Sequence, residues 1–273
     1  MRHVARLDGA AHAVDVLPGN GALLHQAGRV RHNVAIAIHA QRPSAGNLDC
    51  DAMRIRMRRE HEVVFELMLV AVVDNIDTGI DLGVAHFRAL GAQATPVMLL
   101  TRDDAQDQQV LADLRGADMY YFSGGNPEHV IETLRDTPAW QIIRAGYAAG
   151  AVLAGCSAGA MMLGGYTLSV RAVMRGQPPR WLPGFGVAPG IVLMPHFDRV
   201  ADFAGAEMFR AILAAAPPDT TLVGVDEDTA LVHLPSDAKQ RWRVIGRQTV
   251  SVFDREGGRA IYRAGDAVAL GPL

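Results

Sequence analysis

Cysteine is scarce in this chain of 273 residues: Cys50 and Cys156 are the only two. Two cysteines cannot build the disulfide framework that stabilises small secreted domains, so a reducing compartment is expected. An excess of charge is missing as well, because 26 Lys+Arg stand against 29 Asp+Glu and the formal net charge is −3. A near-neutral chain of this kind is not expected to bind nucleic acid or an anionic membrane as its main partner.

Long hydrophobic runs are also absent. The longest one, Val63 to Val73, is interrupted by Glu66 and is too short to span a bilayer. The first twenty residues include Arg2 and Arg6, so they contain no apolar core of a signal peptide. Hydrophobic residues nevertheless make up 49% of the chain, which is enough for a sizeable core. We therefore expect a soluble, cytoplasmic, globular protein without a membrane partner.

Apolar runs alternate with amphipathic stretches from about Gly83 onward. The pattern predicts strands at 95–100, 118–122, 151–154 and 191–194, two more strands around 226–228, and helices at 84–90, 106–114, 127–135, 140–149 and 201–215. Strands that alternate with helices of about ten residues indicate βαβ units and a mostly parallel sheet. The last segments, 244–253, 259–262 and 267–270, have the pattern of short antiparallel strands.

The motif that carries chemistry is Gly-x-Ser-x-Gly, from Gly155 to Gly159, after a predicted strand and before a helical pattern. That is the context of a nucleophile elbow, a sharp turn that exposes the Ser157 hydroxyl and tolerates only small neighbours. The N–H of Ala158 at the start of the helix can then face a developing oxyanion. A purely structural turn is the alternative. Cys156 adjoins the nucleophile position and is interpreted as a small packing residue.

A serine nucleophile needs a base and a group that orients the base. His196 is the candidate base because it follows a predicted strand, at the end where open α/β sheets place their sites. A structural histidine is the alternative. No acidic residue lies between Ser157 and His196, and Asp198 is too close in sequence to orient its own neighbour. The acid is therefore expected from a later strand end, with Glu227 and Asp226 both open; the alternative is that these acids only decorate a tight turn.

A second glycine-rich element, Phe122 to Pro127, lies at another predicted strand end and opens a helix. Its N–H groups can bind an anion, so Gly124 or Gly125 is the candidate for a second oxyanion donor. No lysine follows these glycines and no G-x-G-x-x-G is present, so nucleotide binding is not expected. The histidines and acids also lack the spacing of known metal motifs, and neither a metal nor another cofactor is expected.

Four motifs follow one another in a fixed order: Tyr121–Asn126, Gly155–Ala160, Pro195–Phe197 and Gly224–Ala230. Together they resemble the cyanophycinase and aspartyl dipeptidase (peptidase E) family of serine peptidases, over about residues 84 to 270. The resemblance implies a class I glutamine amidotransferase-like α/β fold: a mostly parallel sheet with helices on both faces, as in a flavodoxin-like three-layer sandwich, and short antiparallel strands at the C-terminus.

By position, the resemblance implies that Ser157 is the nucleophile, His196 the general base, Glu227 the acid and Gly125 the oxyanion-hole glycine. The dipeptidase branch has an aspartate between serine and histidine, and its absence here favours a Ser–His–Glu arrangement. The implied activity is hydrolysis of small aspartyl-containing or β-aspartyl peptides through an acyl-enzyme. The alternative is a non-catalytic amidotransferase-like protein that binds a small acidic ligand.

An anionic peptide substrate needs a cation in the site. The arginines that flank the proposed site in the sequence are Arg171, Arg175, Arg180 and Arg199. Arg175 and Arg199, with Asn126 from the glycine-rich element, are our candidates for substrate binding. The segment Gly176–Gly184 is expected to form a loop over the active site, and a plain connector is the alternative. The partner is a small peptide, and the pattern is compatible with a homodimer.

Residues 1–80 differ from the rest in their weak periodicity. Only Val34–Ile38 and Val63–Val73 have the pattern of core segments, and the basic run Arg54–Arg59 fits a solvated face better than a binding patch. Relatives of this kind open with a first strand and a glycine-rich turn that are not clear here. We therefore interpret residues 1–80 as a divergent segment, or a mis-assigned reading frame, with partly disordered structure, and residues 81–273 as the peptidase domain.

Overall fold

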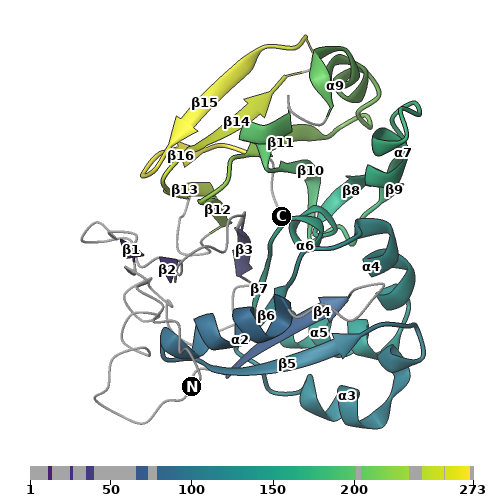
Figure 1. Cartoon of the computed structure of the whole chain (residues 1–273), viewed down its shortest axis with the longest axis vertical. Coiled ribbons are helices and arrows are strands. Elements are labelled where there is room, and N and C mark those ends of the chain that lie inside the picture. Colours follow the sequence, from purple (N-terminus) through teal and green to yellow (C-terminus); the bar gives the residue numbers. More distant parts are fainter. Residues whose placement is uncertain are drawn as a thin grey trace, which may run out of the picture.

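The computed structural model describes residues 66–72, 79–200, 204–233, 242–254 and 256–270, together with the backbone of three short strands at 12–13, 25–26 and 35–39. Two large sheets organise the chain (Figure 1). The eight-stranded sheet has the order β16 (Ala267–Val268), β13 (Trp242–Gly246), β12 (Thr229–His233), β3 (Ala35–His39), β7 (Val152–Gly155), β6 (Met119–Phe122), β4 (Glu66–Val72), β5 (Gln93–Leu99).

The six-stranded sheet lies in the upper part of Figure 1. Its order is β15 (Arg259–Arg263), β14 (Thr249–Phe253), β11 (Thr221–Val225), β10 (Ala188–Pro195), β8 (Gly164–Leu168), β9 (Trp181–Pro183). The strands β1 (His12–Ala13) and β2 (His25–Gln26) form a separate pair. The helices are α2 (Gly79–Ala89), α3 (Gln108–Asp113), α4 (Pro127–Leu134), α5 (Pro138–Ala148), α6 (Ala158–Met161), α7 (Val170–Met174) and α9 (Gly205–Ala214), with 3-10 turns η1 (Asp104–Gln106) and η2 (Phe197–Arg199).

The strand directions confirm the predicted fold class. In the eight-stranded sheet, β4 runs parallel to β5 and β6, and β6 runs parallel to β7. In the six-stranded sheet, β10 runs parallel to β8 and β11. The last strands pair in the antiparallel sense, β14 with β11 and β15, and β13 with β12 and β16. Strand β3 joins the two parts of the eight-stranded sheet: it is antiparallel to β7 and parallel to β12.

Strand β4 shows why helices cover both faces of the eight-stranded sheet. Successive side chains of a strand point to opposite faces, so odd and even positions enter different cores. Leu67 and Leu69 pack with Phe87 of α2, whereas Met68 and Val70 belong to the cluster that contains the buried residues of α3, α4 and α5. A strand buried on both sides carries an almost continuous apolar run, which is the pattern seen in the sequence.

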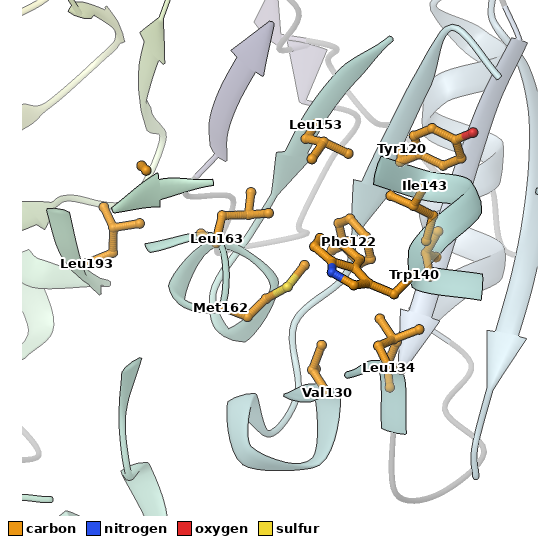
Figure 2. Packing of buried hydrophobic residues seen from close by; sticks show 14 of the residues in the cluster. Tyr120, Phe122, Val130, Leu134, Trp140, Ile143, Leu153, Met162, Leu163 and Leu193 are labelled. Carbon is orange, nitrogen blue, oxygen red and sulfur yellow. The ribbon is translucent and has the colours of Figure 1, made fainter. Parts of the chain in front are cut away.

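Figure 2 shows the core beneath the carboxyl end of β6, where Phe122 and Trp140 lie side by side. Their ring centroids are 6.4 Å apart, and the Trp140 ring is 4.0 Å from that of Phe185. Leu134 and Met162 are fully buried in the same cluster. Each large side chain buried in this way stabilises the fold by about 1.5–3 kcal/mol. This core therefore holds the carboxyl end of β6, which precedes the glycine-rich loop, in place.

Most predicted elements are present, with boundaries shifted by a few residues. The helix predicted at 106–114 instead divides into η1 and α3, because the Asp107 carboxylate accepts from the N–H groups of Gln109 and Val110 and begins a new helix. Strands β8 and β9 and helix α7 were not predicted. The segment Gly176–Gly184, predicted as a loop, contains β9, which pairs with β8 in the antiparallel sense.

The two core segments predicted before residue 80 coincide with strands. Val34–Ile38 overlaps β3 and Val63–Val73 contains β4, and both strands belong to the eight-stranded sheet. The basic run Arg54–Arg59 lies outside the described residues. The division of the chain at residue 80, and the interpretation of the first segment, stay predictions. Among the helices that the structure describes, none is long and apolar enough to cross a membrane.

Candidate active site

Ser157 occupies the turn between β7, which ends at Gly155, and α6, which begins at Ala158. Its backbone has φ 50° and ψ −121°, a region that residues with a Cβ rarely adopt. Such a conformation costs on the order of 1–3 kcal/mol and persists only where the surroundings hold it. The Ser157 side chain makes no capping hydrogen bond to the helix that it precedes. The hydroxyl is therefore presented by the turn and is not used to stabilise it.

The two motif glycines show what holds this turn. A Cβ on Gly155 would lie 2.5 Å from the carbonyl carbon and oxygen of Gly159, and a Cβ on Gly159 would lie 2.4 Å from the carbonyl oxygen of Phe122. Real Cβ atoms essentially never come so close to backbone atoms, so neither position accepts a side chain without a backbone shift. The motif thus has a glycine on each side of Ser157, at the two positions where another backbone segment lies too close for a side chain.

The glycine-rich loop after β6 lies directly against this turn. A Cβ on Gly124 would be 3.2 Å from the Ser157 Cβ, and Gly125 has φ 142°. Asn126 then caps α4, because its Oδ1 accepts from the N–H of Glu128 at 3.1 Å. The Asn126 Nδ2 is buried, and no described residue accepts a hydrogen bond from it. Gly124 is thus the residue of this loop that lies against the serine, and Asn126 joins the loop to α4.

Cys156 is buried beside the serine, in the cluster that contains Tyr121 and Phe87. Burial raises the pKa of its thiol, and the Tyr121 hydroxyl and the backbone N–H of Gly124 lower it by a smaller amount. A buried thiol with a raised pKa is a weak nucleophile, because the thiolate is the reactive form. Cys156 thus has the packing role expected from the sequence.

His196 begins the turn after β10 and has the left-handed backbone φ 53°, ψ 39°. Its Nδ1 lies 3.3 Å from Oε1 of Glu227. The register between β10 and β11 explains this meeting, because Pro195 is the partner of Val225 in the parallel pair and both chains then turn at the same edge. A neutral imidazole that donates from Nδ1 to the carboxylate keeps Nε2 as an acceptor.

The neighbouring Asp226 has a different environment. It is buried, and its Oδ2 accepts from the N–H of Thr249 at 3.1 Å and from the Thr249 hydroxyl at 2.6 Å. The carboxylate of Asp226 therefore connects the β11–β12 turn to the start of β14. Of the two acids left open by the sequence, the structure places Glu227 against His196.

Two residues that sequence reasoning did not select complete this turn. Oδ1 of Asp198 accepts from the N–H of Glu227 at 2.9 Å, and Nε2 of Gln248 donates to the carbonyl oxygen of Glu227 at 2.9 Å. Asp198 was set aside because it cannot orient its near neighbour His196, and its contact is with the backbone of Glu227 instead. The one sequence feature that could have pointed to Asp198 is its position two residues after His196. No sequence feature pointed to Gln248.

Phe197 anchors the turn that carries the histidine. Its ring packs edge-on against Phe209 and Phe253, with centroids 5.6 and 5.4 Å away. A Cβ on Gly224 would lie 2.3 Å from this ring, so a glycine is needed where β11 passes beneath it. The two halves of the site meet through α6, whose Met161 belongs to the same buried cluster as Met194 of β10.

The candidate arginines differ in their ion-pair partners. Nη1 of Arg199 lies 3.8 Å from Oε2 of Glu227, and 48% of its side chain is exposed. Arg180 is paired at 3.4 Å with Glu128, in the first turn of α4. Arg175 is exposed at the end of α7. Within the described ranges, no three histidine, cysteine or acidic side chains are grouped so that they could hold a metal ion.

Fold and site together have the form of an α/β serine hydrolase of the amidotransferase-like kind. Residues 70–240 match the family model of Peptidase family S51, which is more than half of the chain. The chain therefore belongs to peptidase family S51. The matched range contains Ser157, His196 and Glu227.

Individual relatives agree with this assignment. The chain is 29% identical over 177 residues to a cyanophycinase of Trichormus variabilis, covering 62% of this chain and 56% of the relative. It is 30% identical over 174 residues to a cyanophycinase of Synechococcus elongatus, covering 62% and 52%. The chain thus spans about half the length of the curated relatives that it matches. A crystal structure of a peptidase from an acI-B1 actinobacterium is similar with a TM-score of 0.66 and 25% identity, covering 87% of this chain and 97% of that one.

Proposed function

We propose that this chain is a serine peptidase in which Ser157 is the nucleophile, His196 the general base and Glu227 the residue that orients His196. The observation that carries the proposal is the contact of 3.3 Å between His196 Nδ1 and Glu227 Oε1. It leaves Nε2 of the histidine as the proton acceptor that a serine nucleophile requires. The strained backbone at Ser157 supports the same assignment, because strain of this kind collects at functional sites.

The reaction follows from these roles. Nε2 of His196 takes the proton of the Ser157 hydroxyl as Oγ attacks the peptide carbonyl and forms a tetrahedral intermediate. The imidazolium then protonates the leaving amine, and the C–N bond breaks to give an acyl-enzyme and a free amino group. Water, deprotonated by the same nitrogen, hydrolyses the ester and regenerates the serine. Glu227 holds the histidine tautomer and stabilises the positive charge that forms during both steps.

Two backbone donors fit the oxyanion. Ala158 is the first residue of α6, and the first N–H groups of a helix have no acceptor within the helix. For the second donor we propose Gly125, because the N–H of Gly124 already faces the Cys156 thiol. Each donor of this kind stabilises the transition state by about 3–4 kcal/mol.

For the substrate we propose small peptides that contain aspartyl or β-aspartyl groups. The substrate carboxylate needs a cation, and Arg199 is half-exposed beside Glu227. Arg180 is less suited because its ion pair is the shorter one, at 3.4 Å to Glu128, and its partner is not a residue of the proposed triad. Asn126 stays a candidate because it ends the loop whose Gly124 lies against Ser157. Arg175 stays a candidate on its position in the sequence alone.

The test compares wild type with Ser157→Ala on three groups of substrates: α-aspartyl dipeptides, β-Asp-Arg and isoaspartyl peptides. We expect turnover of at least one group that is lost in the variant. An alkyl fluorophosphonate, followed by mass spectrometry, should modify Ser157 of the wild type. No turnover and no labelling of the folded protein would contradict the proposal. That result would favour a non-catalytic amidotransferase-like protein that binds a small acidic ligand.

A further inference from the structure

Glu227 is held at both of its backbone polar groups by residues from two other turns. Its N–H donates to Asp198 Oδ1 at 2.9 Å, and its carbonyl oxygen accepts from Gln248 Nε2 at 2.9 Å and from the Thr229 hydroxyl at 3.1 Å. The same amide nitrogen of Gln248 lies 3.5 Å from Oδ2 of Asp198. Glu227, Asp198 and Gln248 therefore close a ring of hydrogen bonds that joins the turns after β10, β11 and β13.

We propose that Asp198 and Gln248 are positioning residues, which hold the backbone of Glu227 so that its carboxylate reaches His196. This inference rests on the proposed function, because it concerns the acid of the proposed triad. Neither residue touches the reacting atoms in this proposal. Both act through Glu227.

Asp198 is the stronger of the two because of where it lies in the chain. It belongs to η2, the turn that begins directly after His196. The Asp198–Glu227 bond therefore couples the turn that carries the base to the turn that carries the acid, in parallel with the side-chain contact of His196 and Glu227. The pairing of Pro195 with Val225 already brings the two turns together, and the Asp198 bond adds a direct contact to the backbone of Glu227 itself.

Glu227 needs such a restraint for a physical reason. Its side chain has several rotatable bonds, and Arg199 offers its carboxylate a second partner at 3.8 Å from Oε2. Fixing the backbone of Glu227 limits the positions that the carboxylate can reach and keeps Oε1 at Nδ1 of His196. A bond between a carboxylate and a backbone N–H is charge-assisted, so it is stronger than a neutral one. Asp198 is exposed, however, so water competes for it and the effect of its loss is moderate.

The experiment measures the second-order rate constant of fluorophosphonate labelling at Ser157 in the full chain, as a function of pH. We expect Asp198→Ala to be about five times slower than wild type, the value of roughly one net hydrogen bond. Asp198→Asn should retain most of the wild-type rate, because the amide oxygen of asparagine still accepts from the Glu227 N–H. Gln248→Ala should be slowed less than Asp198→Ala, because the Thr229 hydroxyl still donates to the carbonyl oxygen of Glu227.

A double-variant cycle shows whether Asp198 acts through Glu227. In a Glu227→Ala background, Asp198→Ala should no longer change the labelling rate, because the carboxylate that it positions is gone. The matched control is Asp107→Ala. Asp107 also accepts from backbone N–H groups, of Gln109 and Val110, but it begins α3, and its loss should leave the labelling rate unchanged.

Three results overturn the inference while leaving the proposed function intact. The first is Asp198→Ala labelling at the wild-type rate. The second is Asp198→Asn as slow as Asp198→Ala, which assigns the effect to charge. The third is an equal loss in the Glu227→Ala background, which makes Asp198 a general structural residue. If folded wild type is not labelled at all, the proposed function itself fails.

Discussion

The serine half and the histidine half of the proposed site are held in place in different ways. The serine half, residues 122–125 and 155–159, relies on close packing of backbone on backbone at two glycines, Gly155 and Gly159. The histidine half, residues 195–199, 226–229 and 248–249, relies on hydrogen bonds between side chains and turns that are distant in the sequence. Both halves carry residues with positive φ, Ser157 and His196, so both turns are sharp.

The difference determines how each half responds to substitution. Packed backbone offers no room, so one added methyl group displaces the whole turn and the nucleophile with it. A substitution in a network of hydrogen bonds removes one bond at a time, and each bond contributes about 1 kcal/mol, so the loss of activity depends on which bond is removed. We therefore expect substitutions around Ser157 to cause large losses of activity, and substitutions around His196 to cause losses of varied size.

The largest expected effect is that of Ser157→Ala. Removal of the nucleophile should lower kcat by about a millionfold, as in other serine peptidases that lose a triad member. Alanine meets the same backbone strain as serine, so the midpoint of thermal unfolding should not change. Activity on the peptide panel and a melting curve check both statements. A variant that retained measurable turnover above background would remove Ser157 from the mechanism.

Glu227→Gln should have the next largest effect. The amide cannot stabilise the imidazolium, and it favours the wrong histidine tautomer, so we expect a loss of about a thousandfold or more in kcat. The midpoint of the pH profile of kcat/KM should also move to lower pH, because a neighbouring negative charge favours protonated histidine and the variant lacks it. Wild-type rates in this variant would show that the acid lies elsewhere.

Gly159→Ala tests the packed half directly. The new Cβ would lie 2.4 Å from the Phe122 carbonyl oxygen, so the turn has to shift. We expect a loss of about 1–3 kcal/mol in the free energy of unfolding, and a fall in activity of about a hundredfold because Ser157 moves.

Gly190→Ala is the matched control for this substitution. Gly190 lies within β10, where a Cβ would meet nothing within 4 Å. It should leave activity and stability near the wild-type values. Equal behaviour of the two variants in denaturant unfolding and in turnover would mean that the close approach at Gly159 does not position the serine.

Asp226→Ala should have the smallest effect on activity and a clear effect on stability. The change leaves the N–H and hydroxyl of Thr249 without their acceptor, which costs about 1–3 kcal/mol in the free energy of unfolding. Labelling of Ser157 should slow far less than in Glu227→Gln. A larger loss of activity in Asp226→Ala than in Glu227→Gln would exchange the roles of the two neighbouring carboxylates.

The sequence predicted the serine half because its constraints are local. Gly155 and Gly159 occur where another backbone segment leaves no room for a side chain. The apolar run of β4 reflects the burial of that strand on both faces of the sheet. The sequence did not predict β8, which begins with Gly164 and Gly165. A Cβ on Gly165 would lie 2.1 Å from the Pro189 carbonyl oxygen, so these glycines mark a close backbone contact inside a sheet.

By itself, the sequence determined the parallel α/β fold, the position of Ser157 and the strand end that carries His196, since alternation, glycine spacing and strand order are all properties of neighbouring residues. The residue pattern left both acids open and the resemblance favoured Glu227; the tertiary structure shows which carboxylate meets the histidine. Asp226 and Glu227 are adjacent and chemically alike, and Thr249 binds one while His196 faces the other. Asp198 and Gln248 belong to the site for the same reason: contacts between distant turns depend on strand register, which no local pattern records.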